Sequence, residues 1–125
     1  STPSNSSAAS DVYKRQMAAC IARQGRAMGI SHALAPVFDI CRDPRFGRMG
    51  ETYGEDPTLA AAMGTAYVKG LQDKHRMSAC SKHFLGFMAG QGGIIRHRQS
   101  FPRVNCVRFM PSRFRQPLQR ENLTA

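Results

Sequence analysis

Eight charged side chains crowd into one loop of this sequence, among glycines and prolines. The loop belongs to residues 34–57, LAPVFDICRDPRFGRMGETYGEDP, and its charged residues are Asp39, Arg42, Asp43, Arg45, Arg48, Glu51, Glu55 and Asp56. Such a long loop inside a compact domain is commonly a binding or active-site loop. A second cluster, Lys82-His83, follows a short apolar segment. Arg and Lys are charged donors, which make short and strong hydrogen bonds to oxygen.

Both clusters also have a purely structural interpretation. Arg48 could form an ion pair with Glu51 or Asp43 that only stabilises the loop. Lys82-His83 could be a strand-end pair satisfied by backbone groups or carboxylates, as isolated histidines usually are. The residue types alone leave these alternatives open.

Residues 17–93 have the pattern of a βα repeat that would position both clusters. A helix is predicted first, ending near Gly29, with an apolar face at Met17, Cys20, Ile21, Gln24 and Met28. Short strands are predicted at residues 32–36 and 77–81. Between them, Asp56-Pro57 should begin a helix, with Asp as N-cap and Pro in the first turn. The apolar face of that helix is predicted at Leu59, Met63, Ala66, Tyr67 and Leu71. Helices alternating with short strands indicate an α/β fold with a parallel sheet.

Composition places the chain among small single domains with an uneven charge. It has 125 residues and a formal net charge of +10. Residues 1–93 carry 11 basic and 7 acidic side chains, a net of +4, whereas residues 94–125 carry 7 and 1, a net of +6. The basic residues of this tail are all Arg, which leaves nucleic-acid binding through the tail as an alternative function. The four cysteines lack metal-site spacing, and no segment is apolar enough for a membrane span.

The two ends of the chain differ from its middle. Residues 1–16, STPSNSSAASDVYKRQ, are poor in apolar side chains, and we expect them to be a disordered or non-native leader. Residues 95–125 show no period of 2 or 3.6, and three prolines interrupt them. Shifting the reading frame by one base near codon 94 permits the sequence NTASAVIPPRELREVYAFPFQAAIA, which contains an amphipathic helix pattern after a Pro pair. We therefore expect residues 95–125 to be an out-of-frame, disordered tail.

Residues 17–94 resemble the N-terminal domain of glycoside hydrolase family 3. The resemblance is carried in order by ARQGRAMGISHALAPVFDICRDPRFGRMGETYGEDP, AAAMGTAYVKGLQ and SACSKHFLGFMAGQGGI. The shifted tail also resembles what the family carries at this point. Phe46 stands where many relatives have Trp, and Phe87-Met88 is also unusual.

The resemblance implies a fragment, about two βα units, of a (β/α)₈ TIM-type barrel. In such barrels the active site lies at the carboxyl ends of the strands, where both clusters fall. The resemblance implies that Arg48, Lys82 and His83 bind the hydroxyl groups of the sugar. It also implies that internal ion pairs hold the loop, so Asp43, Glu51 and Glu55 are not expected to act as acid or base.

The reaction implied is retaining hydrolysis of β-glucosides or β-xylosides at the non-reducing end, by two carboxylates. In the family these carboxylates come from later parts of the protein. We therefore assign no catalytic residue, metal or cofactor to this chain, and expect it to be inactive without the rest of the barrel and the second domain. The expected partner is a β-linked glycoside, not a nucleic acid or a membrane. A non-catalytic sugar-binding remnant is a further alternative.

Overall fold

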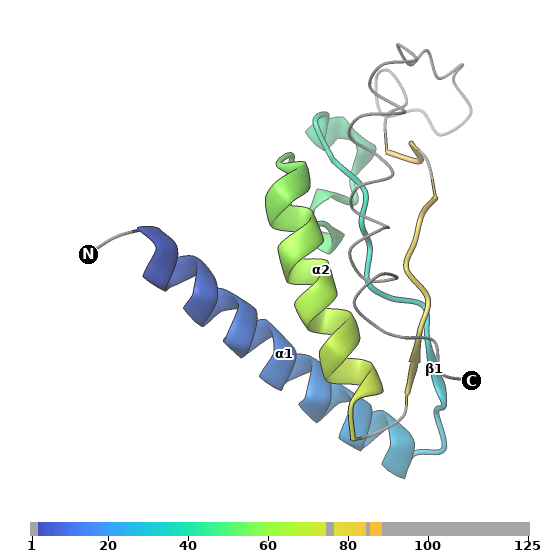
Figure 1. Cartoon of the computed structure of the whole chain (residues 1–125). Coiled ribbons are helices and arrows are strands. Elements are labelled where there is room, and N and C mark those ends of the chain that lie inside the picture. Colours follow the sequence, from blue (N-terminus) through green and yellow to red (C-terminus); the bar gives the residue numbers. More distant parts are fainter. Residues whose placement is uncertain (1–2, 75–76, 85, 89–125) are drawn as a thin grey trace. The chain divides into compact units, whose positions relative to one another are not determined.

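The computed structural model describes residues 3–74, 77–84 and 86–88 (Figure 1). The chain divides into two compact units. The first comprises Ser1–Pro36 and Ala62–Cys80, and the second comprises Val37–Ala61 and Ser81–Ala125. The Arg-rich tail lies outside the described residues, together with the predictions of a frame change and of nucleic-acid binding that rest on it. No helix in the described ranges is both long and apolar enough to cross a membrane.

The first unit opens with a helix where we expected a disordered leader. Helix α1 spans Pro3–Ala27, so the described part of residues 1–16, expected to be a disordered or non-native leader, is helical. No Gly or Pro interrupts the chain between Pro3 and Gly25, so a helix anchored near its end can extend backwards. An ion pair between Arg15 and Asp73, with Nη2 and Oδ2 2.9 Å apart, adds a contact within this stretch. The predicted stop is confirmed, because Gly29 has a left-handed φ of 84°.

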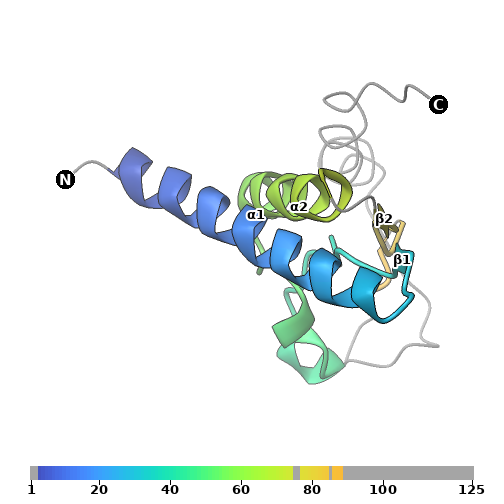
Figure 2. The same ribbon diagram turned by 90° about the horizontal axis from the view of Figure 1, so that it is seen from below.

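The buried face of α1 differs from the predicted one. Ala18, Ala22 and Gly25 are buried, whereas Met17, Ile21 and Met28 are exposed. Helix α1 lies beside the C-terminal part of helix α2, Pro57–Gln72, as Figures 1 and 2 show. The small side chains of α1 permit this close approach. A methyl group on Gly70 of α2 would meet the carbonyl oxygen of Arg15 and the Cβ of Ala18. Close packing of small residues therefore decided the buried face, against the larger apolar side chains.

Helix α2 spans Pro57–Gln72 and begins where the sequence predicted. The N–H of Thr58 donates to Asp56 Oδ1 at 2.8 Å, which confirms Asp56 as the cap. Within the first unit, Leu71 is fully buried with Ala18, Ala22 and Met77. The predicted face was partly wrong, because Leu59 is 45% exposed.

The two strands of the first unit are parallel and very short. Strand β1, His32–Ala33, pairs in parallel with β2, Ser78–Ala79, and His32 lies opposite Ser78. The parallel pairing and the intervening helix confirm the α/β character. Both strands are shorter than predicted, because only these residues satisfy the ladder hydrogen bonding.

The second unit consists of the charged loop and the segment that contains Lys82-His83. Val37 and Lys82 form an isolated parallel bridge, and the N–H of Phe38 donates to the carbonyl oxygen of Lys82 at 2.6 Å. The loop folds into two 3₁₀ turns, Pro44–Phe46 and Met49–Glu51. A small core of Val37, Cys41, Phe46 and Met88 holds the unit together.

Candidate sugar-binding site

Arg48 lies in the charged loop and is held there by Glu51. Its Nε donates to Oε1 and its Nη2 donates to Oε2 of Glu51, both at 2.6 Å. A bidentate pair of this kind fixes the plane of the guanidinium. Of the two ion pairs that the sequence left open for Arg48, the structure contains the one with Glu51. The Arg48 side chain remains 34% exposed, so the pair does not close it off from solvent.

Asp43 pairs with Arg45 instead. Arg45 donates to Asp43 through Nε at 2.8 Å and Nη2 at 2.6 Å, and its main-chain N–H bonds Oδ1 at 3.0 Å. The last bond caps the first 3₁₀ turn, which ends at Gly47 with φ 80°. The Asp43 hydrogen bond raises the pKa of Arg45 above its usual value. This pair shapes the loop, and Arg45 itself is an exposed side chain.

His83 is fixed by a carboxylate that lies 44 positions earlier in the chain. Asp39 Oδ2 is 2.7 Å from His83 Nδ1 and also accepts the main-chain N–H of His83 at 3.1 Å. The Asp39 side chain is 1% exposed and that of His83 26%. The peptide bond between Lys82 and His83 is cis. A buried acceptor therefore sets the position of a partly exposed imidazole.

The aromatic ring of Phe87 contacts both Arg48 and His83. Its centroid lies 4.0 Å from that of His83, with the planes 32° apart. The guanidinium carbon of Arg48 lies 5.4 Å from the same centroid, within the range of a cation–π contact. Phe46 packs edge-on against Phe87, with 5.2 Å between centroids. Phe87 thus supports Arg48 and His83 on one apolar surface.

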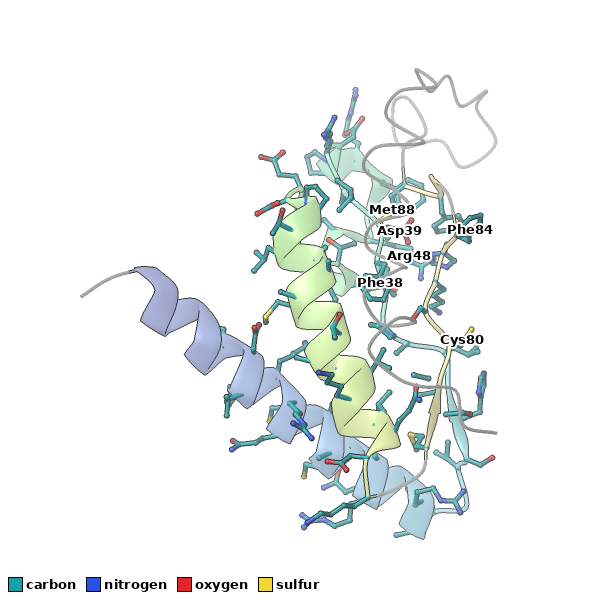
Figure 3. The ribbon with its side chains drawn as sticks, in the orientation of Figure 1. Phe38, Asp39, Arg48, Cys80, Phe84 and Met88 are labelled. Atoms are coloured by element: carbon teal, nitrogen blue, oxygen red, sulfur yellow. The ribbon has the colours of Figure 1, made fainter. Side chains whose placement is uncertain are left out.

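Neighbouring charges change the pKa values of Glu51 and Arg48. The hydrogen bond from Arg48 is the main cause of a lowered pKa of Glu51, and the charges of Arg48 and Lys82 lower it further. The hydrogen bond to Glu51 raises the pKa of Arg48, with a smaller contribution from the charge of Asp39. Figure 3 labels Asp39 and Arg48 in this part of the chain. In the structure, Arg48 and His83 contact the same ring of Phe87, and Lys82 directly precedes His83 in the chain.

Sequence reasoning missed two members of this arrangement, Asp39 and Phe87. Asp39 was recognised only as one charge among eight, and Phe87 only as an unusual residue. A signal for Asp39 was present, because it follows an apolar segment much as Lys82-His83 does.

The described residues contain no group of three or more His, Cys, Asp or Glu side chains that could hold a metal. The arrangement offers charged donors and one imidazole, which suits a ligand rich in oxygen atoms.

Comparison with known proteins identifies the family. The profile described as the glycosyl hydrolase family 3 N-terminal domain matches residues 3–106. The chain belongs to glycosyl hydrolase family 3. The match to this family extends beyond both borders, 17 and 94, of the segment that the sequence motifs suggested.

Curated family 3 relatives are considerably longer than this chain. A β-xylosidase of Formosa agariphila is 40% identical over 88 residues, covering 64% of this chain and 12% of the relative. A periplasmic β-glucosidase/β-xylosidase of Dickeya chrysanthemi is 37% identical over 89 residues, covering 66% of this chain and 14% of the relative. This family 3 chain therefore spans about one seventh or less of these two proteins.

A solved family 3 structure has the same fold over most of the chain. The β-glucosidase of Listeria innocua in complex with glucose matches with a TM-score of 0.82 and 29% identity. The match covers 87% of this chain and 16% of that enzyme. The relatives and this neighbour are glycoside hydrolases, and the chain shares their family and their α/β character.

Proposed function

We propose that this chain forms part of the sugar-binding site of a retaining glycoside hydrolase that acts on β-glucosides or β-xylosides. The single observation that supports this most directly is that Arg48 and His83 contact the same ring of Phe87, while the buried carboxylate of Asp39 holds His83. Sugar hydroxyls accept hydrogen bonds from charged donors, and such bonds are stronger than those between neutral groups. The names of the relatives, β-xylosidase and β-glucosidase, support the class of substrate.

The proposal includes the architecture around the site. The α/β pattern, the parallel strand pair and the family suggest about two βα units of a (β/α)₈ barrel. A retaining mechanism needs two carboxylates about 5–5.5 Å apart on either side of the scissile bond. In this proposal both come from other parts of the parent protein. The chain by itself should then bind sugar weakly and hydrolyse nothing.

A chimera tests the proposal directly. Residues 17–88 of this chain would replace the structurally equivalent segment of the Listeria innocua β-glucosidase. Hydrolysis of p-nitrophenyl β-glucoside and β-xyloside would then be compared for the chimera and its Arg48→Ala, Lys82→Ala and His83→Ala variants. Loss of a hydrogen bond to a charged group costs about 1.5–3 kcal/mol, so kcat/KM should fall roughly 10- to 150-fold.

The matched control is Arg45→Ala. It removes an arginine of the same loop that also forms a bidentate pair, but on Asp43. We expect kcat/KM of this variant to stay within about 3-fold of the parent chimera. Equal losses in Arg45→Ala and Arg48→Ala would refute the assignment of Arg48 to the sugar. Hydrolysis by the 125-residue chain alone would refute the placement of both catalytic carboxylates elsewhere.

A further inference from the structure

We propose that Asp39 is a positioning residue that fixes the hydrogen of neutral His83 on Nδ1, so that Nε2 presents a lone pair to the ligand. The geometric part stands on the described residues, and only the identity of the ligand as a sugar rests on the function proposed above. Asp39 would thereby convert His83 into a hydrogen-bond acceptor without touching the ligand itself.

The first support is that a single oxygen, Asp39 Oδ2, bonds both the main-chain N–H and the ring Nδ1 of His83. It accepts the main-chain N–H of His83, a group that can only donate, at 3.1 Å. The same oxygen lies 2.7 Å from the ring Nδ1. An ionised carboxylate only accepts, so the ring nitrogen must supply the hydrogen of this second bond. In a neutral imidazole one nitrogen donates and the other accepts, and Nε2 is then the acceptor.

The second support is that the carboxylate is dedicated to His83. The Asp39 side chain is 1% exposed, and its other oxygen, Oδ1, has no hydrogen-bond partner among the described residues. A buried polar oxygen left without a donor costs free energy, so its burial needs another source of stabilisation. The bonds of Oδ2 to His83 and the nearby charge of Arg48 provide it.

The third support is that the ring has little freedom and yet remains accessible. Asp39 holds one edge of the imidazole, and Phe87 lies against its face with 4.0 Å between centroids. The His83 side chain nevertheless keeps 26% of its surface exposed. A ligand can therefore reach the imidazole, while its orientation and its hydrogen are already set.

The consequence is a division of roles between the three candidate residues. Arg48 and Lys82 have donors and no acceptor, so they can only bond ligand oxygens. A sugar hydroxyl also carries a hydrogen that needs an acceptor. Nε2 of His83 can take that hydrogen, which a phosphate dianion or a carboxylate ligand could not offer. Asp39 thus favours a neutral polyol over an anion in a site that contains two permanent cations.

Nuclear magnetic resonance of the imidazole nitrogens tests the proposal. The 125-residue chain would be labelled with ¹⁵N in its histidine rings and studied above pH 8, where imidazole is neutral. His83 would be assigned by comparison with a His83→Gln variant. Long-range ¹H–¹⁵N correlations should show His83 predominantly with the hydrogen on Nδ1. A wild-type His83 with its hydrogen on Nε2, the form that an unfolded chain would also give, overturns the proposal.

Three variants of Asp39 separate positioning from a merely structural role. Asp39→Ala removes the acceptor, and Asp39→Leu replaces it with an apolar side chain of similar size, so both should shift His83 toward the Nε2–H form. Asp39→Asn keeps an amide oxygen that can accept the main-chain N–H and the ring N–H of His83, so it should retain the Nδ1–H form, as should Arg45→Ala. If the tautomer is unchanged in both Asp39→Ala and Asp39→Leu, the proposal is wrong. The tautomer of the wild-type chain decides the matter if neither variant folds.

Titration with glucose and xylose keeps this proposal distinct from the proposed function. If the wild-type chain shows the Nδ1–H form and binds either sugar, Asp39→Ala should weaken that binding roughly 10-fold, the equivalent of one lost hydrogen bond. Retained sugar affinity in a variant whose tautomer has changed overturns the role of His83 as acceptor. A Nδ1–H form in a chain that binds neither sugar supports the positioning by Asp39 and contradicts the assignment of the ligand.

Discussion

Arg48 and Glu51 lie edge to edge, with Nε and Nη2 of the guanidinium each 2.6 Å from a different carboxylate oxygen. This pair uses one edge of the guanidinium fork. Among the described residues, the remaining terminal nitrogen of Arg48 makes no hydrogen bond. The structural and the binding interpretations of Arg48 are therefore compatible, because the ion pair orients a side chain that still has donors available for a ligand.

The first prediction concerns the ionisation of Glu51. Its pKa is lowered chiefly by the hydrogen bond from Arg48, so Arg48→Ala should return it toward the usual value of a glutamate. Because the pKa of Glu51 is lower in the folded chain, its ion pair with Arg48 contributes fully to folding stability above the pKa that Glu51 has in the unfolded chain. This contribution to stability disappears as the pH falls through the lower pKa that Glu51 has in the folded chain. A ¹³C titration of the Glu51 carboxyl group in wild type and variant measures the change.

Arg45→Ala is the control for this titration. It removes the neighbouring ion pair on Asp43 and leaves both hydrogen bonds to Glu51 in place. The Glu51 titration should then match that of the wild type. An identical midpoint in wild type and Arg48→Ala would show that the pair seen here does not persist in solution.

The second prediction uses the conservative variant Arg48→Lys in the chimera. Lysine retains the charge but cannot bond two oxygens of Glu51 with a planar fork. We expect KM to rise and kcat/KM to fall about 10-fold or more, since the cation is no longer oriented. Arg45→Lys is the matched change and should have little effect. Similar kinetics for Arg48→Lys and the parent chimera would show that charge alone suffices at this position.

The third prediction concerns the contact of α1 with α2. Gly70→Ala places a methyl group against the carbonyl oxygen of Arg15 and the Cβ of Ala18. Backbone cannot move aside as a side-chain end can, so the free energy of unfolding should fall by about 1–3 kcal/mol. Thermal and urea unfolding followed by circular dichroism measure the loss.

Gly50→Ala provides the comparison for Gly70→Ala. A methyl group at Gly50 would meet no atom within 4 Å, and Gly50 does not have the positive φ that favours glycine. The free energy of unfolding of the Gly50→Ala variant should be unchanged or slightly raised, because alanine restricts the conformations of the unfolded chain. A loss of stability in Gly50→Ala as large as that in Gly70→Ala would contradict close packing as the reason.

The fourth prediction concerns the coding DNA near codon 94. We propose that one base is missing there, because residues 95–125 lack periodicity and seven Arg and no Lys supply all their basic side chains. The family match continues to residue 106, so the resemblance alone does not fix the position of the change. Resequencing should restore one base and open the frame into PPRELREVYAFPF. Codons that cannot encode this shifted sequence would refute the frame change and leave the Arg-rich tail as a genuine part of the protein.

Short-range signals determined several elements of this chain directly from the sequence. Asp56 and Pro57 begin α2 because a cap and a fixed φ act within a few residues. Gly29 follows the end of α1 for a similar local reason. The alternation of helices and strands predicted the parallel pairing of β1 and β2, and the loop motifs predicted the family.

Tertiary structure decided what depends on contacts between distant parts of the chain. Hydrophobic spacing favoured Met17, Ile21 and Met28 on α1, yet Ala18 and Ala22 are buried because only small residues permit the close approach at Gly70. Asp39 meets His83 across 44 positions, a pairing that no local propensity encodes. The sequence thus determined where helices begin and which residues carry charge. Packing determined which faces are buried and which carboxylate orients the imidazole, because both depend on distances that exist only once the chain has folded.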